Sequence, residues 1–269
     1  MIVKTSKGDL NIPYSASEIA YKDYLPFSKG IEALIAKGEK KEDGSIYVPL
    51  EVSIEATVNA VKEYYKRDKE ALVIIEQLPF ESENGGLGFG QTVTILAIYQ
   101  QIYSLILSFE PKKTKRFSFK LGGSTYEVQN ASVQNFSRYE FNKAIGLPFD
   151  FTGGEIGEIL SLRSVIQEQA PQLEGQQLLN LIYTGDIKQL SIVCRKRGEQ
   201  LPSDFAARQA FINSRMELFK DLDMATILTA NFFLSNTITE SLQMKLLAHF
   251  TANGKAAESK KVTKLAKVA

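Results

Sequence analysis

From Gly85 to Phe109 the chain carries no charged residue, and this run constrains the fold more than any other segment. A membrane-spanning helix needs about 20 mainly apolar residues, but glutamine, threonine and serine interrupt this run. Its apolar side chains instead recur at helical spacing, at Ile95, Ile98, Ile102, Leu105, Ile106 and Phe109. The sequence therefore predicts a helix over residues 91–109 that is buried or faces a partner, and no membrane span.

Two glycine-containing turns, each between short extended segments, predict two β-hairpins. The first covers residues 2–12 and the second covers residues 116–128. A polar link and a helix that bears aromatic residues are expected after each hairpin. Two interpretations remain open: an internal duplication, or two unrelated copies of a common supersecondary unit.

Apolar periodicity and capping signals predict that most of the remaining chain is helical. Pro26 is expected to break or re-aim the first helix, because proline removes a backbone donor. Ser203 is expected to be the N-cap of a helix that runs to about Lys220. Residues 187–194 fit either a strand or a helix. The main expected helices cover residues 28–35, 50–75, 91–109, 155–170, 174–183, 203–220 and 224–250.

These elements predict an α+β protein that is mainly α, with two units that are each opened by a small β-hairpin. The charged segment 110–115 marks the expected boundary between the units. The first, over residues 1–111, joins its hairpin to helices, and the second, over residues 112–250, joins its hairpin to a helical bundle. Residues 251–269 are rich in lysine and are expected to be a flexible basic tail.

Side chains that commonly perform chemistry near neutral pH are scarce in this chain. Among its 269 residues it has one histidine, His249, and one cysteine, Cys194. A lone imidazole makes no metal site, and Cys194 follows an apolar run with no histidine near it in sequence. We interpret Cys194 as a structural thiol. We therefore expect no enzyme activity, and neither a cofactor nor a metal.

Two further patterns have a chemical and a structural interpretation. The glycine-rich segment 85–90 has the wrong spacing for a phosphate-binding loop, so it is interpreted as a helix-entry loop. Three pairs of carboxylates could in principle act as acid and base: Glu81 with Glu83, Glu155 with Glu158, and Asp221 with Asp223. We interpret the first pair as part of a solvated loop, and the other two pairs as acids at helix starts.

Basic clusters offer an alternative function in contact with nucleic acid. The net charge of +1 gives no global attraction, so any such contact would be local. Residues 112–116, residues 195–197 and the lysine tail are the candidate clusters. The structural interpretation is a solvated linker, a surface turn and a solubilising tail. Within the tail, the candidate phosphate contacts are Lys260, Lys261, Lys264 and Lys267.

Several motifs, in order along residues 10–240, resemble accessory proteins encoded in the structural gene clusters of tailed bacteriophages. The closing motif is the clearest, with Phe219-Lys220-Asp221-Leu222-Asp223-Met224 followed by Phe232-Phe233. The sequence departs from those proteins at Asp223, where proline is common. The other matching segments are Leu10–Pro13, Ser17–Leu25, the apolar run 91–109, the linker 111–113 and the hairpin end Tyr126-Glu127-Val128.

This resemblance implies a bacteriophage structural or assembly protein, similar to tail-assembly or baseplate chaperones, that acts by protein–protein contacts. It implies a location in the host cytoplasm during assembly, or in the virion. The expected partners are other phage structural proteins or further copies of the chain, and the alternative function is a DNA-associated packaged protein. Packing into the chain's own core competes with partner contact at each candidate residue. The candidate contact residues are Tyr99, Ile102, Tyr103 and Ile106, or Phe232 and Phe233.

Overall fold

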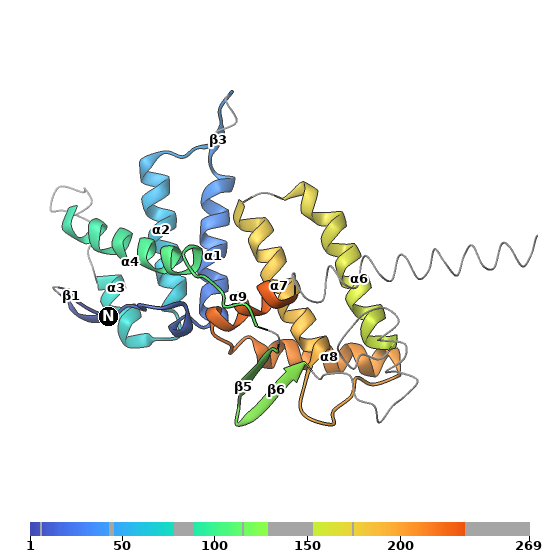
Figure 1. Ribbon diagram of the computed structural model, residues 1–269. Coiled ribbons are helices and arrows are strands. Elements are labelled where there is room, and N and C mark those ends of the chain that lie inside the picture. The colour runs from blue at the N-terminus through green and yellow to red at the C-terminus, as the bar shows by residue number, and fades with distance from the viewer. Residues whose placement is uncertain are drawn as a thin grey trace, which may run out of the picture.

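The computed structural model describes residues 1–5, 7–42, 46–77, 89–114, 116–128, 153–173 and 175–234. Over these ranges the chain is an α+β protein that is mainly α, as predicted (Figure 1). In the same ranges three small antiparallel sheets accompany the helices: β1 with β2, β3 with β4, and β5 with β6 and β7.

The predicted N-terminal hairpin is confirmed. β1 (Ile2–Thr5) and β2 (Gly8–Asn11) pair antiparallel, with Val3 opposite Leu10. Gly8 has a φ of 145°, and a Cβ at this position would lie 2.8 Å from Cδ1 of Ile74 on α3 (Lys69–Gln77). The turn therefore needs glycine both for its backbone conformation and for its close approach to α3.

The two long helices that follow form an antiparallel pair. α1 (Tyr21–Ala36) and α2 (Leu50–Tyr64) are joined by β3 (Glu39–Lys40) and β4 (Ile46–Tyr47), and β3 extends beyond the helix ends (Figure 1). A Cβ at Gly30 would lie 2.8 Å from Cβ of Ala60. These two small residues let the helix backbones approach closely.

Pro26 does not break α1, so the predicted break is wrong. The helix runs continuously through Pro26, with Tyr24 and Phe27 buried on either side of it. A proline inside a helix costs about 3 kcal/mol, whereas burying a large apolar side chain contributes about 2 kcal/mol each time. Burial of two aromatic rings on the helix face therefore offsets the lost backbone hydrogen bond.

The helix predicted over residues 50–75 is two helices, α2 and α3. Asp68 begins α3, because its Oδ1 accepts a hydrogen bond from the backbone N–H of Ala71 at 3.1 Å. The uncharged run forms α4 (Phe89–Leu107), which packs across α2 (Figure 1). The helix predicted over residues 91–109 is thus confirmed with a shift of two residues at each end.

The second predicted hairpin is also confirmed. β5 (Ser118–Leu121) and β6 (Ser124–Val128) pair through Gly122 and Gly123, whose φ values of 54° and 72° favour glycine. β7 (Cys194–Arg195) adds to β6, with Arg195 opposite Glu127. The ambiguous segment 187–194 is therefore helical up to Val193 and turns to strand at Cys194.

Four helices make up the described part of the predicted C-terminal bundle. Asp204, not Ser203, caps α8, because its Oδ1 accepts from the backbone N–H of Ala207 at 2.8 Å. Asp223 caps α9 in the same way through Thr226. α7 is the central helix and contacts α1, α6, α8 and α9. The bounds are α6 (Gly153–Gln169), followed by a 3-10 turn at Ala170–Gln172, α7 (Gly175–Val193), α8 (Phe205–Phe219) and α9 (Met224–Phe233).

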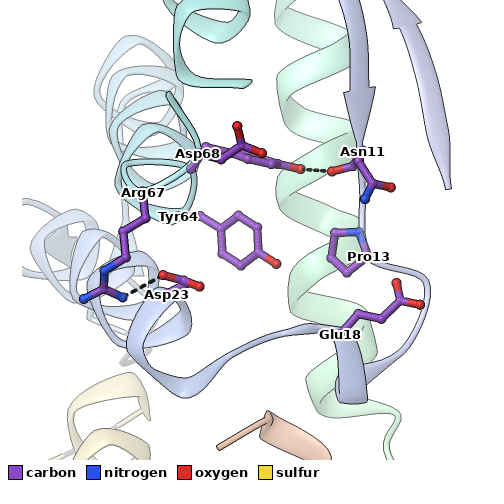
Figure 2. Close-up of a pocket in the computed structure, with 8 residues that line it drawn as sticks. Asn11, Pro13, Glu18, Asp23, Tyr64, Arg67 and Asp68 are labelled. Atoms are coloured by element: carbon purple, nitrogen blue, oxygen red, sulfur yellow. Dashed lines mark hydrogen bonds and ion pairs between the residues drawn. The ribbon is translucent and has the colours of Figure 1, made fainter. Parts of the chain in front are cut away.

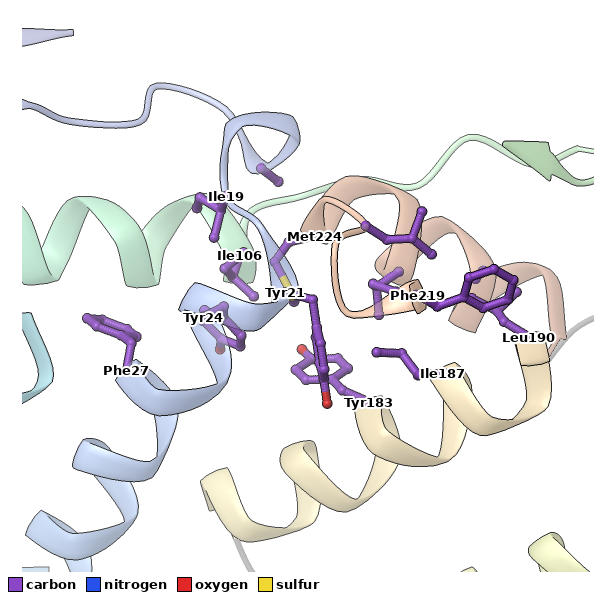
Figure 3. Close-up of a cluster of buried hydrophobic side chains, with 14 of the residues drawn as sticks. Ile19, Tyr21, Tyr24, Phe27, Ile106, Tyr183, Ile187, Leu190, Phe219 and Met224 are labelled. Atoms are coloured by element: carbon purple, nitrogen blue, oxygen red, sulfur yellow. The ribbon is translucent and has the colours of Figure 1, made fainter. Parts of the chain in front are cut away.

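Residues of the two predicted units share one hydrophobic core. The backbone N–H of Tyr21 donates to the carbonyl of Leu222 at 2.8 Å, and the N–H of Met224 donates to the carbonyl of Ile19 at 2.8 Å. Figure 3 shows Tyr21 and Tyr183 where α1 meets α7, with Met224 beside them. The boundary near residue 111 stays a prediction. The helix expected after the second hairpin lies outside the described residues, and so does residue 235 onward.

We expect Phe27→Ala to lower the free energy of unfolding by about 3–5 kcal/mol, because it leaves a cavity in the core. Phe27 is fully buried, and its ring lies 5.3 Å from that of Tyr99 and 6.1 Å from that of Tyr64. Urea unfolding followed by circular dichroism would measure the change. Phe205→Ala is the matched control, because Phe205 is 66% exposed, and equal losses in the two variants would contradict the described core.

Candidate functional site

The inner face of α4 lies in the core. Ile95 and Ile98 are buried there, and so are the predicted contact residues Ile102 and Ile106. A side chain enclosed by its own chain has no surface to offer a partner. We therefore correct the assignment of Ile102 and Ile106 and place them among the core residues.

Phe233 requires the same correction. It is buried, and its ring stacks on that of Phe117 with 5.6 Å between the ring centroids. The neighbouring Phe232 is half-buried. The pair predicted as a contact site is thus divided between the core and the surface of α9.

Tyr99 and Tyr103 lie at the edge of the inner face of α4. Both are half-buried, and their rings stack with 6.1 Å between centroids. Burial raises the pKa of Tyr99 to about 12, so its phenol stays protonated near neutral pH. These two rings keep part of their surface accessible, and their role as contacts stays a prediction.

The outer face of α4 is exposed and uncharged. We define this outer face by Val93, Leu96, Ala97, Gln100 and Leu107, which recur three, four or seven residues apart along the helix. Val93, Leu96 and Leu107 are 47%, 39% and 59% exposed. Sequence reasoning missed these residues because it assigned one apolar face only. The signal was present, since a helix without charge on any face is typical of a helix covered on all sides.

A pocket of about 320 Å³ lies where β2, α1 and the end of α2 meet (Figure 2). Tyr64 lies between the ion pair of Arg67 with Asp23, at 2.7 Å, and Pro13. Burial raises the pKa of Tyr64, so its hydroxyl stays protonated near neutral pH. The residues that line the pocket are Asn11, Pro13, Glu18, Asp23, Tyr64, Tyr65, Arg67 and Asp68.

The polar groups of this pocket also support the local structure. Oε2 of Glu18 accepts from the backbone N–H of Tyr14 at 3.1 Å, and the Tyr65 hydroxyl donates to the carbonyl of Asn11 at 2.9 Å. Asp68 caps α3 as described above. The pocket is acidic, but each of its carboxylates has a structural partner on the chain.

Glu155 lies in the first turn of α6, as its interpretation as an acid at a helix start predicted, and both Glu155 and Glu158 are buried. Oε1 of Glu155 lies 2.9 Å from Nη1 of Arg195, and the two side chains are 0% and 2% exposed. Oε1 of Glu158 accepts from Nε of Arg208 at 2.7 Å, and its Oε2 accepts from Gln209 at 2.9 Å. Both carboxylates therefore connect α6 to other elements of the C-terminal unit.

The interpretation of residues 195–197 as a basic cluster on the surface is corrected at Arg195, because its side chain is buried. Arg195 is enclosed with Glu155, which leaves only Lys196 and Arg197 exposed in residues 195–197. The lysines of the tail, Lys260, Lys261, Lys264 and Lys267, lie outside the described residues, as do His249 and the segment 78–88.

Cys194 is fully buried, as its interpretation as a structural thiol requires. Burial raises the pKa of the thiol well above its usual range, although Arg215 and Arg195 oppose this shift. Nη1 of Arg215 donates to the Cys194 carbonyl at 2.7 Å, and Arg215 also pairs with Glu199. The Arg215 guanidinium lies 4.4 Å from the ring centroid of Phe211. This arrangement fixes β7 against α8.

Comparison with protein-family models, with curated proteins and with solved structures found no match. Among the described helices, none has the length and apolar character needed to cross a membrane. In the same part of the chain, histidine, cysteine and carboxylate side chains do not gather in groups of three or more that could hold a metal ion.

We expect Arg195→Ala to lower the free energy of unfolding by about 3–5 kcal/mol, because it leaves the Glu155 carboxylate buried without its partner. Thermal and urea unfolding would measure the loss. Lys22→Ala is the control, since Lys22 pairs with Asp221 at 2.6 Å with side chains 36% and 50% exposed. Exposed pairs contribute about 0–1 kcal/mol, so a loss in the control as large as that of Arg195→Ala would contradict this account.

Proposed function

We propose that this protein is a bacteriophage structural or assembly protein that binds another structural protein of the particle through the outer face of α4. The sequence resemblance supports the phage context. One structural observation supports the mode of action: Val93, Leu96 and Leu107 are exposed aliphatic residues on the outer face of a helix that carries no charge, with the polar Gln100 and Ser104 between Leu96 and Leu107. An uncharged helix face with exposed aliphatic side chains favours protein–protein contact.

The position of α4 makes its outer face suitable for binding. The inner face is held in the core by four buried isoleucines, Ile95, Ile98, Ile102 and Ile106. A helix fixed in this way presents its outer side chains without further ordering of the backbone, which reduces the entropic cost of association. The partner surface that complements this uncharged face is itself mainly apolar, such as one face of a helix.

The carboxylates that most resemble an acid–base site have structural partners, which supports binding rather than catalysis. The carboxylates of the pocket cap a helix, pair with Arg67 or accept a backbone hydrogen bond. Glu155 and Glu158, the candidates for an acid–base pair, are each bound to an arginine. Their observed contacts are structural.

The phage context is tested by mass spectrometry of particles from a phage that encodes the chain, comparing mature virions with assembly intermediates. Stoichiometric presence in virions would support a structural role, and presence only in intermediates would support a chaperone. Absence from both would overturn the proposal.

We expect Leu107→Lys to weaken binding to any phage structural protein that co-purifies with the chain at least about tenfold, because binding would then desolvate a charge. The lysine lies near the C-terminus of α4, where a cation suits the helix dipole, so we expect stability to change by less than about 0.5 kcal/mol. Affinity would be measured by surface plasmon resonance with the full chain.

Val165→Lys is the matched control, because Val165 is a 44% exposed aliphatic residue in the last turns of α6. We expect it to bind as the unmodified chain does. Equal binding by the two lysine variants would argue against the outer face of α4. Self-association that Leu107→Lys abolishes, without another phage protein bound, would make a second copy the partner and overturn the proposed heterologous contact.

A further inference from the structure

The pocket between β2, α1 and the end of α2 has more hydrogen-bond acceptors than the fold requires. Glu18 accepts a backbone N–H through Oε2 alone, and Asp23 accepts from Arg67 through Oδ1 alone. Asp68 caps α3 through its Oδ1. One oxygen of each carboxylate therefore holds the local structure, and the other accepts no hydrogen bond from the described residues.

Rings form the wall of this pocket. Tyr65 is 5% exposed and Pro13 is buried, and the ring of Tyr64 meets that of Tyr65 edge-on with 4.9 Å between centroids. Within the part of the chain that the structure describes, the Tyr64 hydroxyl donates no hydrogen bond, although the charges of Asp23 and Glu18 act on it. A cavity of about 320 Å³ thus combines a wall of ring surface with free oxygen acceptors.

The polar groups of the pocket lie at two ends of this wall. In Figure 2, Glu18 and Asp23 lie on one side of the Tyr64 ring, and Asp68 and Asn11 lie on the other. Among the described lining residues Arg67 is the one cation, and it pairs with Asp23. Glu18 therefore leaves one negative charge at the first end, and Asp68 leaves one at the second.

This arrangement suits an organic cation with two separate charges. The described carboxylates do not gather in threes around one point, as a metal ion requires. An ammonium group has three N–H donors, which match the free oxygens of Glu18 and Asp23 and the hydroxyl of Tyr64. A methylene chain packs on ring surface while its charged end stays at the polar rim, and a cation near a tyrosine ring gains a cation–π contact.

We propose that this pocket binds a linear aliphatic diamine, with one ammonium group at each end of the wall of rings. Glu18, Asp23 and the Tyr64 hydroxyl hold the first ammonium group. Asp68 and the side-chain oxygen of Asn11 hold the second. The bound diamine connects β2, α1 and the junction of α2 with α3. The proposal is independent of the contact surface on α4, so either can fail without the other.

The test is titration of the full chain with linear diamines, from diaminopropane to diaminohexane, at low ionic strength. Two-dimensional NMR of the backbone amides would follow binding. We expect saturable shifts at residues 11–18 and 64–68, with a Kd below about 1 mM for the best diamine. A monoamine of the same carbon number should bind at least about tenfold more weakly, because it reaches one charged end only. Absence of saturable shifts, or equal binding of diamine and monoamine, would overturn the proposal.

Two substitutions test the two ends separately. Glu18→Gln and Asp68→Asn each remove one charge and keep an oxygen for the backbone N–H that the carboxylate accepts, so both variants should fold. We expect each to weaken diamine binding at least about tenfold. Glu168→Gln is the matched control, because Glu168 is an exposed carboxylate on α6 and the change in charge is the same. Unchanged binding by either pocket variant would overturn the proposal.

A lysine side chain is the other source of an alkylammonium group. A short uncharged peptide with a single lysine, blocked at both termini, would be titrated under the same conditions. We expect it to bind more weakly than the best diamine, because its one ammonium group occupies one end of the pocket. Tighter binding by the peptide would overturn the diamine and assign the pocket to a lysine of another protein segment.

Discussion

The backbone pairing between residues 19–22 and 220–224 is the contact on which the rest of the structure depends. Tyr21 and Met224 donate to carbonyls on the opposite segment at 2.8 Å each, and Lys22 donates to the Lys220 carbonyl at 3.0 Å. These bonds attach the start of α1 to the turn between α8 and α9. They bring Tyr24 against Tyr183 of α7, with 6.2 Å between ring centroids. Because α1 is also packed on α2, and α2 on α4, one local exchange of hydrogen bonds positions both halves of the core.

The two halves are held by different kinds of interaction. The N-terminal half relies on aromatic and aliphatic packing, such as Phe27 among the tyrosines of α2 and α4. The C-terminal half adds buried polar contacts, including Glu155 with Arg195 and Asp186 with Asn231. Apolar packing has no direction, whereas a buried ion pair is costly in any register but one. We interpret the polar contacts as the feature that fixes how α6, α9 and β7 lie on α7.

Local signals in the sequence predicted local structure well. Both hairpins follow from glycine turns, and the uncharged run formed a helix as its periodicity indicates. The errors concern choices that distant residues decide. Pro26 stays helical because its neighbours are buried by other helices, and β7 exists only because β6 pairs with it. The buried ion pair of Glu155 with Arg195 follows the same rule, since no spacing along the chain predicts it.

The outer face of α4 raises a different question, because the core does not require it to be apolar. Four isoleucines on the inner face already anchor the helix, and polar residues at Val93, Leu96 and Leu107 would leave that packing intact. Exposed aliphatic side chains contribute little to folding and favour association. Their stabilising effect is realised only when another surface covers them. The buried inner face thus accounts for where α4 lies. Coverage of the outer face by a partner, as proposed, would account for the lack of charge on that face.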